Sequence, residues 1–267
     1  VMNGEYYIMS FNQNVTSFST SGLQAFLNDP AASMKDIRLS ATKMTDEEVL
    51  TEYGGERTDF NPLYDFIRDI TPVYIEVQQV QISPDRQSEF TLTPSLLSQK
   101  ITFRINMEIE SGVTLENVMA EISGLAGSVE TMTGQIDNEE TFRSLMTMEE
   151  VSSEGNRKIY EGTINTFGLF PSKNQTFITG PGILQVTIRA TDGTDTKVFH
   201  AGINIRQTIT DAGILAELEN GKFRIARNEV TLEIPNTLKI DKDQIAPGED
   251  QGVEIWIDSD EILDVEI

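Results

Sequence analysis

Apolar and polar residues alternate with a period of two along several parts of the chain. In residues 101–110, every odd position from Ile101 to Ile109 is apolar and every even position is polar. Because successive side chains of a β-strand point to opposite faces, this segment predicts a strand with one buried and one solvated face. Residues 184–190 and 198–205 alternate in the same way on either side of Asp192-Gly193, which predicts a β-hairpin.

The same pattern predicts strands elsewhere, at residues 5–11, 73–82, 117–123, 158–168, 229–234 and 253–257. The segment 73–82 changes parity, because Val73, Ile75 and Val77 are odd whereas Val80 and Ile82 are even. One extra residue would restore a single buried face, so we predict a β-bulge near Gln78-Gln79.

Helical signals are fewer and shorter. Thr45 followed by Glu48 resembles a capping box and predicts a helix over residues 45–50. Thr210 as an N-cap predicts a second helix over 210–219, and residues 21–27 add a turn. Residues 28–72 otherwise form a polar excursion between strands.

Many short strands separated by turn residues predict an all-β fold class of β-sandwiches, with short helices in the connections. At about 150 residues per domain, 267 residues suggest two domains. Residues 84–88 have the composition of a linker, so we expect an N-terminal domain over 1–88 and a C-terminal domain over 89–267.

Composition excludes several classes of function. Asp and Glu total 43 and Lys and Arg total 20, so the formal net charge is −23 and argues against nucleic-acid binding or a basic membrane-binding patch. The chain contains no cysteine, which excludes disulfide scaffolds, Cys-ligated metals and cysteine nucleophiles. No uninterrupted apolar run approaches the roughly 18 residues of a membrane span.

Candidate chemistry is sparse. The only histidine, His200, falls within a predicted strand, and no serine-elbow motif accompanies it. The acidic turns at 241–243 and 258–261 offer oxygen ligands for calcium but lack the rest of an EF-hand loop. Trp256 is either a packed side chain or a sugar-stacking or adhesive contact. We therefore expect no catalytic, cofactor-binding or metal-binding residue, and no enzyme activity.

Several short sequence segments, taken together, resemble those of one protein family. They are Gly4–Asn12, Pro94–Leu97 leading into 101–110, Ala120–Ser128 followed by Thr133-Gly134, Thr166–Gly168, the Asp192-Gly193 turn and the segment around Trp256. In this order the chain resembles the fimbrillin-associated lipoproteins of Bacteroidetes, which include the FimB-type fimbrial anchors. The match covers most of the chain.

This resemblance implies two transthyretin-like β-sandwich domains and a bacterial cell-surface location, either attached to the outer membrane or within a fimbria. It implies a non-enzymatic anchor, accessory or adhesion protein whose partners are fimbrillin or other fimbrial subunits. The expected lipid-bearing cysteine and first strand are not in this sequence, so we expect the N-terminal domain to start upstream of Val1 and membrane contact to occur only through an upstream lipid.

Two alternatives remain from the sequence. A surface glycan-binding lipoprotein would align exposed aromatic residues on one face, and a hydrolase would gather titratable groups in a deep pocket. The strand at 5–11 leads to a further expectation. A sandwich that lacks one strand exposes unpaired backbone groups, so the N-terminal domain is expected to use its edges for strand exchange, unless the 28–72 excursion covers them.

Overall fold

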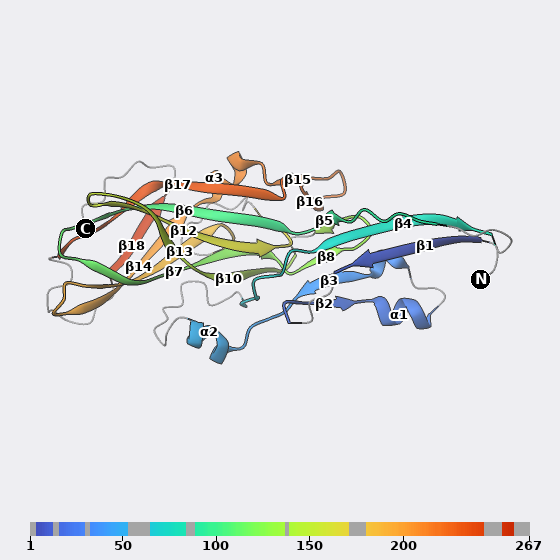
Figure 1. The fold of residues 1–267 in the computed structure, drawn as a ribbon, viewed down its shortest axis with the longest axis horizontal. Coiled ribbons are helices and arrows are strands. Elements are labelled where there is room, and N and C mark those ends of the chain that lie inside the picture. The colour runs from blue at the N-terminus through green and yellow to red at the C-terminus, as the bar shows by residue number, and fades with distance from the viewer. Residues whose placement is uncertain are drawn as a thin grey trace.

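The computed structural model describes residues 4–12, 16–29, 33–52, 65–83, 89–136, 139–170 and 180–242, together with the backbone of 253–258. Across these residues the protein is built mainly of β-strands, with only short helices in the connections (Figure 1). The all-β fold class predicted from the alternation is therefore confirmed.

Two large sheets form the main sandwich. One sheet has five strands, in the order β10 (Thr141–Thr147), β7 (Thr114–Ala126), β13 (Ile183–Thr191), β14 (Thr196–Asn204) and β18 (Val253–Asp258). The other has four, in the order β11 (Glu149–Glu154), β12 (Arg157–Thr166), β6 (Gln99–Ile109) and β17 (Glu229–Ile240). The hairpin expected around Asp192-Gly193 is confirmed as β13 and β14, paired from Ile183–Asn204 to Thr191–Thr196.

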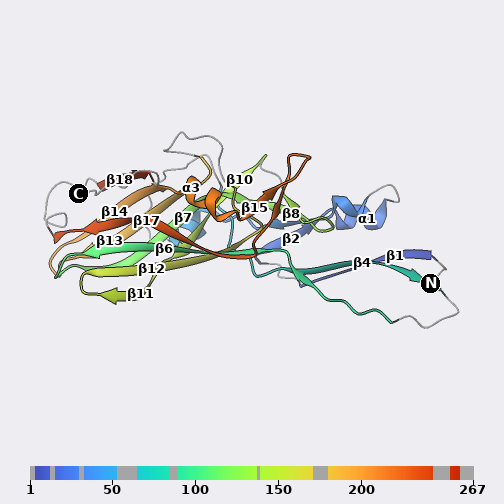
Figure 2. The same cartoon turned by 90° about the horizontal axis from the view of Figure 1, so that it is seen from above.

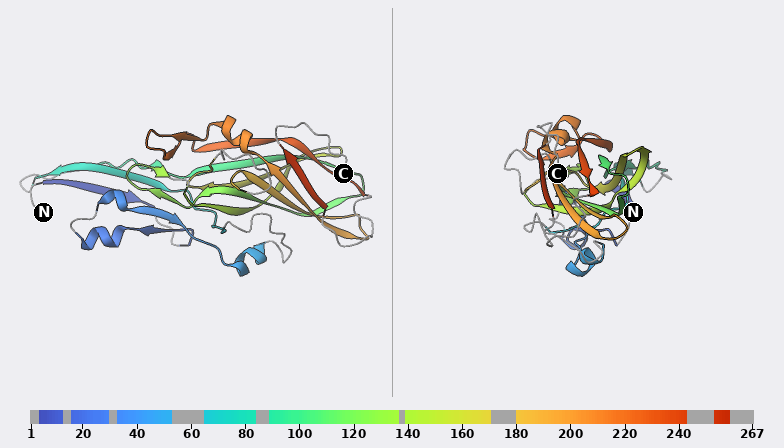
Figure 3. Two further views of the ribbon diagram at one scale, coloured as in Figure 1. Left: turned by 180° about the vertical axis from the view of Figure 1, so that it is seen from behind. Right: turned by 90° about the vertical axis from the view of Figure 1, so that its left-hand side faces the viewer.

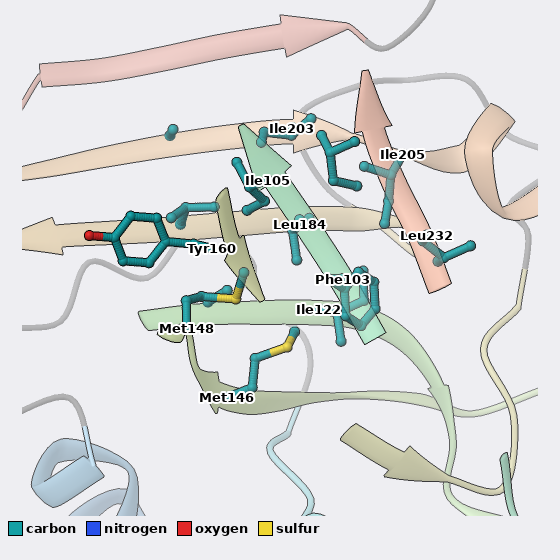
Figure 4. Close-up of a cluster of buried hydrophobic side chains, with 14 of the residues drawn as sticks. Phe103, Ile105, Ile122, Met146, Met148, Tyr160, Leu184, Ile203, Ile205 and Leu232 are labelled. Carbon is teal, nitrogen blue, oxygen red and sulfur yellow. The ribbon is translucent and has the colours of Figure 1, made fainter. Parts of the chain in front are cut away.

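The core lies between these two sheets. The odd residues of β6 from Ile101 to Ile109 are at most 4% exposed, and they pack with apolar side chains of β7, β13, β14 and β17. Figure 4 shows Phe103 and Ile105 of β6 among Ile122, Leu184 and other side chains from the facing strands. The period-two pattern thus produces the sandwich by placing each strand's apolar face inward.

Three smaller sheets extend the molecule. They are β1 (Gly4–Phe11), β4 (Tyr74–Ile82) and β5 (Ser95–Leu96); β2 (Phe18–Ser21), β3 (Arg38–Ala41) and β8 (Ser128–Glu130); and β15 (Leu215–Glu217), β16 (Phe223–Ile225) and β9 (Gln135–Ile136). A second apolar cluster joins early and late segments, because Phe18 and Leu39 pack in it with Val129 and Phe167. The predicted linker lies outside the described residues, and the division at residue 88 stays a prediction.

The helices are α1 (Leu23–Asn28), the 3-10 turn η1 (Met34–Asp36), α2 (Asp46–Glu52) and α3 (Arg206–Ala212). The capping box before α2 is confirmed, since the Thr45 N–H donates to a Glu48 carboxylate oxygen at 2.8 Å and the Glu48 N–H donates to Thr45 Oγ1 at 3.3 Å. None of the described helices is long and apolar enough to cross a bilayer.

The segment around α2 covers the outer face of the five-stranded sheet. Val49 packs there with Phe66, Met119 and Leu145. Beside this cluster, the side chains of Arg143 and Glu121 are 3% and 2% exposed, with Nη1 and Oε1 3.4 Å apart, and the Arg143 guanidinium lies 4.0 Å from the centre of the Phe66 ring. A buried charge needs such partners, so this face is an interior surface and not a solvated one.

Three local predictions were wrong. The pairing of β4 with β1 is regular along its whole length, so there is no bulge at Gln78-Gln79. Instead β4 buries Ile75 on one face and Val80 on the other, which a twisted two-stranded ribbon allows because no further sheet fixes its covered face. The segment 28–72 is more than an excursion, because it contains β3, which pairs with β2 and β8.

The predicted helix at 210–219 is the third error. α3 begins at Arg206, and Gly213 ends it in the left-handed conformation with φ of 57°. Residues 215–217 then form β15. Glycine is the residue that terminates helices in this way, so Gly213 outweighs the good helix formers that follow it.

The sandwich core predicts a large difference between adjacent positions of β6. Phe103 is fully buried, so Phe103→Ala is expected to lower the free energy of unfolding by about 3–5 kcal/mol. Thr102 lies on the outer face with its hydroxyl 3.0 Å from that of Thr163, so Thr102→Ala is expected to cost less than about 1 kcal/mol. Urea unfolding measures both, and equal losses would contradict the assigned faces.

Candidate assembly interface

The strands β1 and β4 form a long two-stranded ribbon. They pair antiparallel from Gly4–Ile82 to Phe11–Ile75 without a register shift. Figure 2 shows the ribbon extending past the sandwich at the N-terminal end of the molecule, and Figure 3 shows β18 at the opposite end. The ribbon therefore places most of its length away from the two large sheets.

Among the residues that the structure describes, both outer edges of this ribbon lack a strand partner over most of their length. In the part of the chain that the structure describes, β1 pairs only with β4, and β4 pairs on its other side with β5 only at Tyr74–Leu96 and Ile75–Ser95. From Glu76 to Ile82, no strand of the described part of the chain pairs with the second edge of β4. Such an edge presents a row of backbone donors and acceptors to any incoming strand.

Two other sheet edges in the molecule, those at β11 and β17, carry features that discourage strand addition. β11 has three glutamates in six residues and a register shift between Glu150 and Ser152. β17 contains Pro235 and a register shift between Glu233 and Thr237. β1 and β4 contain no lysine, arginine or proline and have a regular register. The ribbon edges are therefore more open to pairing by their own sequence than the edges at β11 and β17.

The ribbon also exposes large side chains. Tyr7 near its tip is 50% exposed and Tyr74 at its base is 48% exposed. Their positions in the register place them on opposite faces of the ribbon. Tyrosine combines a large apolar area with a polar tip, and it is a residue type enriched at protein interfaces. Both faces of the ribbon can therefore contribute contacts to a partner.

A cleft of about 320 Å³ opens where the pairing of β4 with β5 stops. One wall is formed by residues 75–77 of β4 and 95–97, and the other by the turn 131–134 with Arg224, Ile225 and Asn228. The side-chain amide of Asn228 donates to the Leu96 and Ser98 carbonyl oxygens at 3.0 Å each, which holds β5 in place. A strand added to β4 beyond β5 would bring its side chains next to this cleft.

Glu130 fixes the turn that forms the second wall. Its carboxylate, on a residue only 8% exposed, accepts from Arg38 Nη2 at 3.0 Å and from the Thr133 hydroxyl at 2.7 Å, and it pairs with Lys222 Nζ at 2.5 Å. Burial alone would raise the pKa of Glu130, but the hydrogen bonds from Lys222 and Thr133 and the charges of Lys222 and Arg38 together lower it.

The residues that the sequence offered as candidates for catalysis, sugar stacking or calcium binding are not brought together in one site among the described residues. His200 is 7% exposed on the outer face of the five-stranded sheet, with Nδ1 3.1 Å from the Thr187 hydroxyl. Trp256 lies in β18, where its backbone is in register with Gly202, but its side chain is outside the described residues, as are 243 and 259–261. Among the described residues, no three His, Asp or Glu side chains gather closely enough to hold a metal ion. The absence of catalytic, cofactor and metal residues stays a prediction.

The sequence predicted the strand at 5–11, and an open edge beside it as one of two alternatives, but it did not predict the cleft. The cleft needs β5 and the turn 131–134, which are too short for a period to be read. Pro94 and the glycine at 134, with φ of 66°, were the available signals.

No family model matches the chain, and the search of curated proteins found no match. Among solved structures, a proposed adhesin from Bacteroides ovatus is 15% identical, with 96% of this chain and 76% of that chain covered and a TM-score of 0.45. A proposed adhesin from Bacteroides thetaiotaomicron is 11% identical, with coverage of 90% and 72% and a TM-score of 0.46.

Proposed polysaccharide-binding proteins from Bacteroides thetaiotaomicron are 10% identical, with coverage of 88% and 70% and a TM-score of 0.42. None of these three is described as fimbrillin-associated. Because identities and TM-scores are low, we take nothing about this chain's function from them, and the resemblance to the fimbrillin-associated family stays a prediction.

The lowered pKa of Glu130 predicts a pH-dependent contribution to stability. A carboxyl with a depressed folded-state pKa stabilises the fold above its unfolded pKa of about 4.3, and this stabilisation is lost as pH falls through the folded-state pKa. Glu130→Gln is therefore expected to be less stable than the wild type at pH 7, with the difference shrinking as the pH is lowered toward 3.

Urea unfolding between pH 7 and pH 3 measures this difference. The matched control is Glu229→Gln, which removes an exposed carboxylate 2.9 Å from Lys100 and is expected to change stability little at any pH. A constant difference between Glu130→Gln and wild type across this range would contradict the role assigned to Glu130.

Proposed function

We propose that this chain is a non-enzymatic protein of the bacterial cell surface, a fimbrial anchor, accessory or adhesion subunit that joins fimbrillin or other fimbrial subunits through the β1–β4 ribbon. The observation that carries the proposal is the pair of long, regular edges that have no strand partner among the described residues over most of their length and no lysine, arginine or proline within their strands.

Strand addition follows from the hydrogen-bonding chemistry of such an edge. Among the described residues, no strand pairs with β4 beyond Ile75 on the side of β5, or with β1 on the side away from β4. A partner strand supplies hydrogen bonds to the backbone groups of such an edge, with a net gain of about 0.5–1.5 kcal/mol per bond. Because the gain is repeated along the strand, a segment of several residues supports a stable contact.

The cleft beside β5 distinguishes one end of this edge from the other, and its side chains can select between partner strands. Main-chain pairing is insensitive to sequence, whereas pockets for alternate side chains distinguish one partner from another. The cleft lies at the base of the ribbon, so it selects the side chains at one end of the incoming strand. The ribbon and cleft together form the proposed assembly interface.

Location and attachment are proposed from the family resemblance. We place the protein at the outer membrane or in a fimbria, with membrane contact only through a lipid carried upstream of Val1. The absence of cysteine and the placement of His200 inside a sheet, beside Thr187, support a role without catalysis.

Site-specific cross-linking on intact cells tests the proposal. Because the chain has no cysteine, Gln79→Cys places a single reactive thiol on an exposed position of the ribbon for a photoactivatable maleimide. The expected product is a covalent adduct with a fimbrial subunit, identified by mass spectrometry. The matched control is Ser153→Cys, on the exposed edge strand β11.

The two variants must be displayed on the cells at equal levels. The proposal expects the adduct from position 79 and little from position 153. Fimbriae that assemble normally while position 79 yields no subunit adduct, or equal yields from both positions, would show that the ribbon is not the joining surface.

A further inference from the structure

Residues 89–94 follow β4 in the chain and lead back to β5, and we call them the return segment. Among the described residues, β5 pairs with β4 only at Tyr74–Leu96 and Ile75–Ser95, and the return segment belongs to no strand. Figure 2 shows the trace that returns from the end of β4 running apart from it. The return segment is therefore next to the open edge of β4 in the chain but is not paired with it in this structure.

The return segment nevertheless has the sequence of a strand. Phe90 and Leu92 are apolar, and they alternate with Thr91 and Thr93. Aromatic and β-branched residues are enriched in strands. Phe90 is 38% exposed, so the apolar face of this pattern is incompletely buried.

Contacts beside β5 fix the register in which the return segment can meet β4. The Leu97 N–H donates to the Val73 carbonyl oxygen at 2.7 Å, and the Val73 N–H donates to the Ser98 hydroxyl at 3.0 Å. Because these bonds hold the start of the pairing in place, the rest of the pairing has one continuation.

This continuation brings apolar side chains together. It places Leu92 opposite Gln78, and Phe90 opposite Val80. On its other side Val80 is opposite Tyr6 of β1, and residues that are opposite in register share a face. Val80 is only 5% exposed, so Phe90 would join the most buried part of the ribbon.

The backbone of β4 is oriented for the same pairing. The bond from Leu97 to Val73 shows that odd positions of β4 direct their backbone groups toward the side of β5. Val77 and Gln79 therefore direct theirs toward the return segment. Pro94 falls opposite an even position, where the backbone groups of a pair point away from each other, so its missing N–H removes no bond to β4.

We propose that the return segment pairs with β4 as an internal strand in the unassembled protein, and that a partner's strand displaces it. This inference rests on the proposed assembly role and names the regulation of the same edge. Only nine residues, 81–89, join Val80 to Phe90, so closing the pair costs little chain entropy and the segment competes at a high effective concentration. Because the partner's strand takes the same place, it needs apolar residues at alternate positions on the Val80 face.

Cysteine pairing in the purified chain tests the closed form without any partner. Residues in a non-hydrogen-bonded antiparallel pair, such as Gln78 and Leu92 in this register, have Cα atoms about 4.5 Å apart, which a disulfide can bridge. The chain has no other cysteine. In a glutathione redox buffer, Gln78→Cys, Leu92→Cys is expected to show an effective thiol concentration at least about tenfold above that of the control Gln78→Cys, Thr91→Cys, whose side chains point to opposite faces.

Amide exchange gives a second measurement that leaves both paired segments free of cysteine. In the closed form the Gln79 N–H is bonded to the return segment, so its exchange is expected to be at least about tenfold slower in the wild type than in Phe90→Asp. Urea unfolding checks that each variant is folded.

Recovery of the fimbrial subunit with the displayed protein tests the displacement. The double variant Gln78→Cys, Leu92→Cys is compared with its two single variants, which cannot form the disulfide, at equal display levels on cells. The oxidised double variant is expected to recover at least about tenfold less subunit than either single variant, and a reductant is expected to restore the recovery.

Each part of the proposal has its own contrary result. Equal effective concentrations for the two cysteine pairs, or equal Gln79 exchange in the wild type and Phe90→Asp, would overturn the closed form. Undiminished recovery of the subunit with the oxidised double variant would overturn the displacement and leave the β1 edge as the joining edge. If the wild type recovers no subunit, the proposed function and the displacement both fail, while the cysteine pair and amide exchange still decide the closed form.

Discussion

Each β-strand has backbone N–H and C=O groups along both edges, and these groups need hydrogen-bond partners. Which strand edges are paired with a neighbouring strand determines how this molecule is built. In the two large sheets, interior strands such as β6 and β7 are paired on both sides, and their apolar faces close the core. The edge strands β11 and β17 end their sheets with acids, a proline and register shifts. The ribbon of β1 and β4 carries one glutamate in each strand but no proline and no register shift, so its long regular edges are the feature from which the proposed function follows.

The elongated arrangement separates stability from interaction. The sandwich holds the large buried cluster and supplies most of the fold's hydrophobic stabilisation, while the ribbon extends from it with faces that are only partly covered (Figure 2). The early chain is tied to the sandwich by the second cluster and by pairing of β3 with β8. A partner bound at the ribbon would therefore be connected to a packed core.

Sequence alone predicted the parts of the fold in which one physical signal acts without competition. The alternation in 101–110 defined β6, and Asp192-Gly193 defined the hairpin, because a half-buried strand and a tight turn each leave a local pattern. Where two signals compete, the prediction was wrong: Gly213 ended a helix whose composition favoured continuation, and the change of parity in β4 reflects a twisted ribbon and not a bulge. The cleft could not be predicted, because it joins residues from distant segments whose register only the tertiary structure sets.

Amide hydrogen exchange tests the role of the ribbon most directly, because it reports the backbone hydrogen bonds themselves. Exchange is measured in the isolated protein and in assembled fimbriae that contain it, with peptides from β1, β4 and β11 compared. The account predicts that exchange in β1 or β4 slows at least about tenfold on assembly, while exchange in β11 is unchanged. Unchanged exchange in both ribbon strands within assembled fimbriae would contradict it.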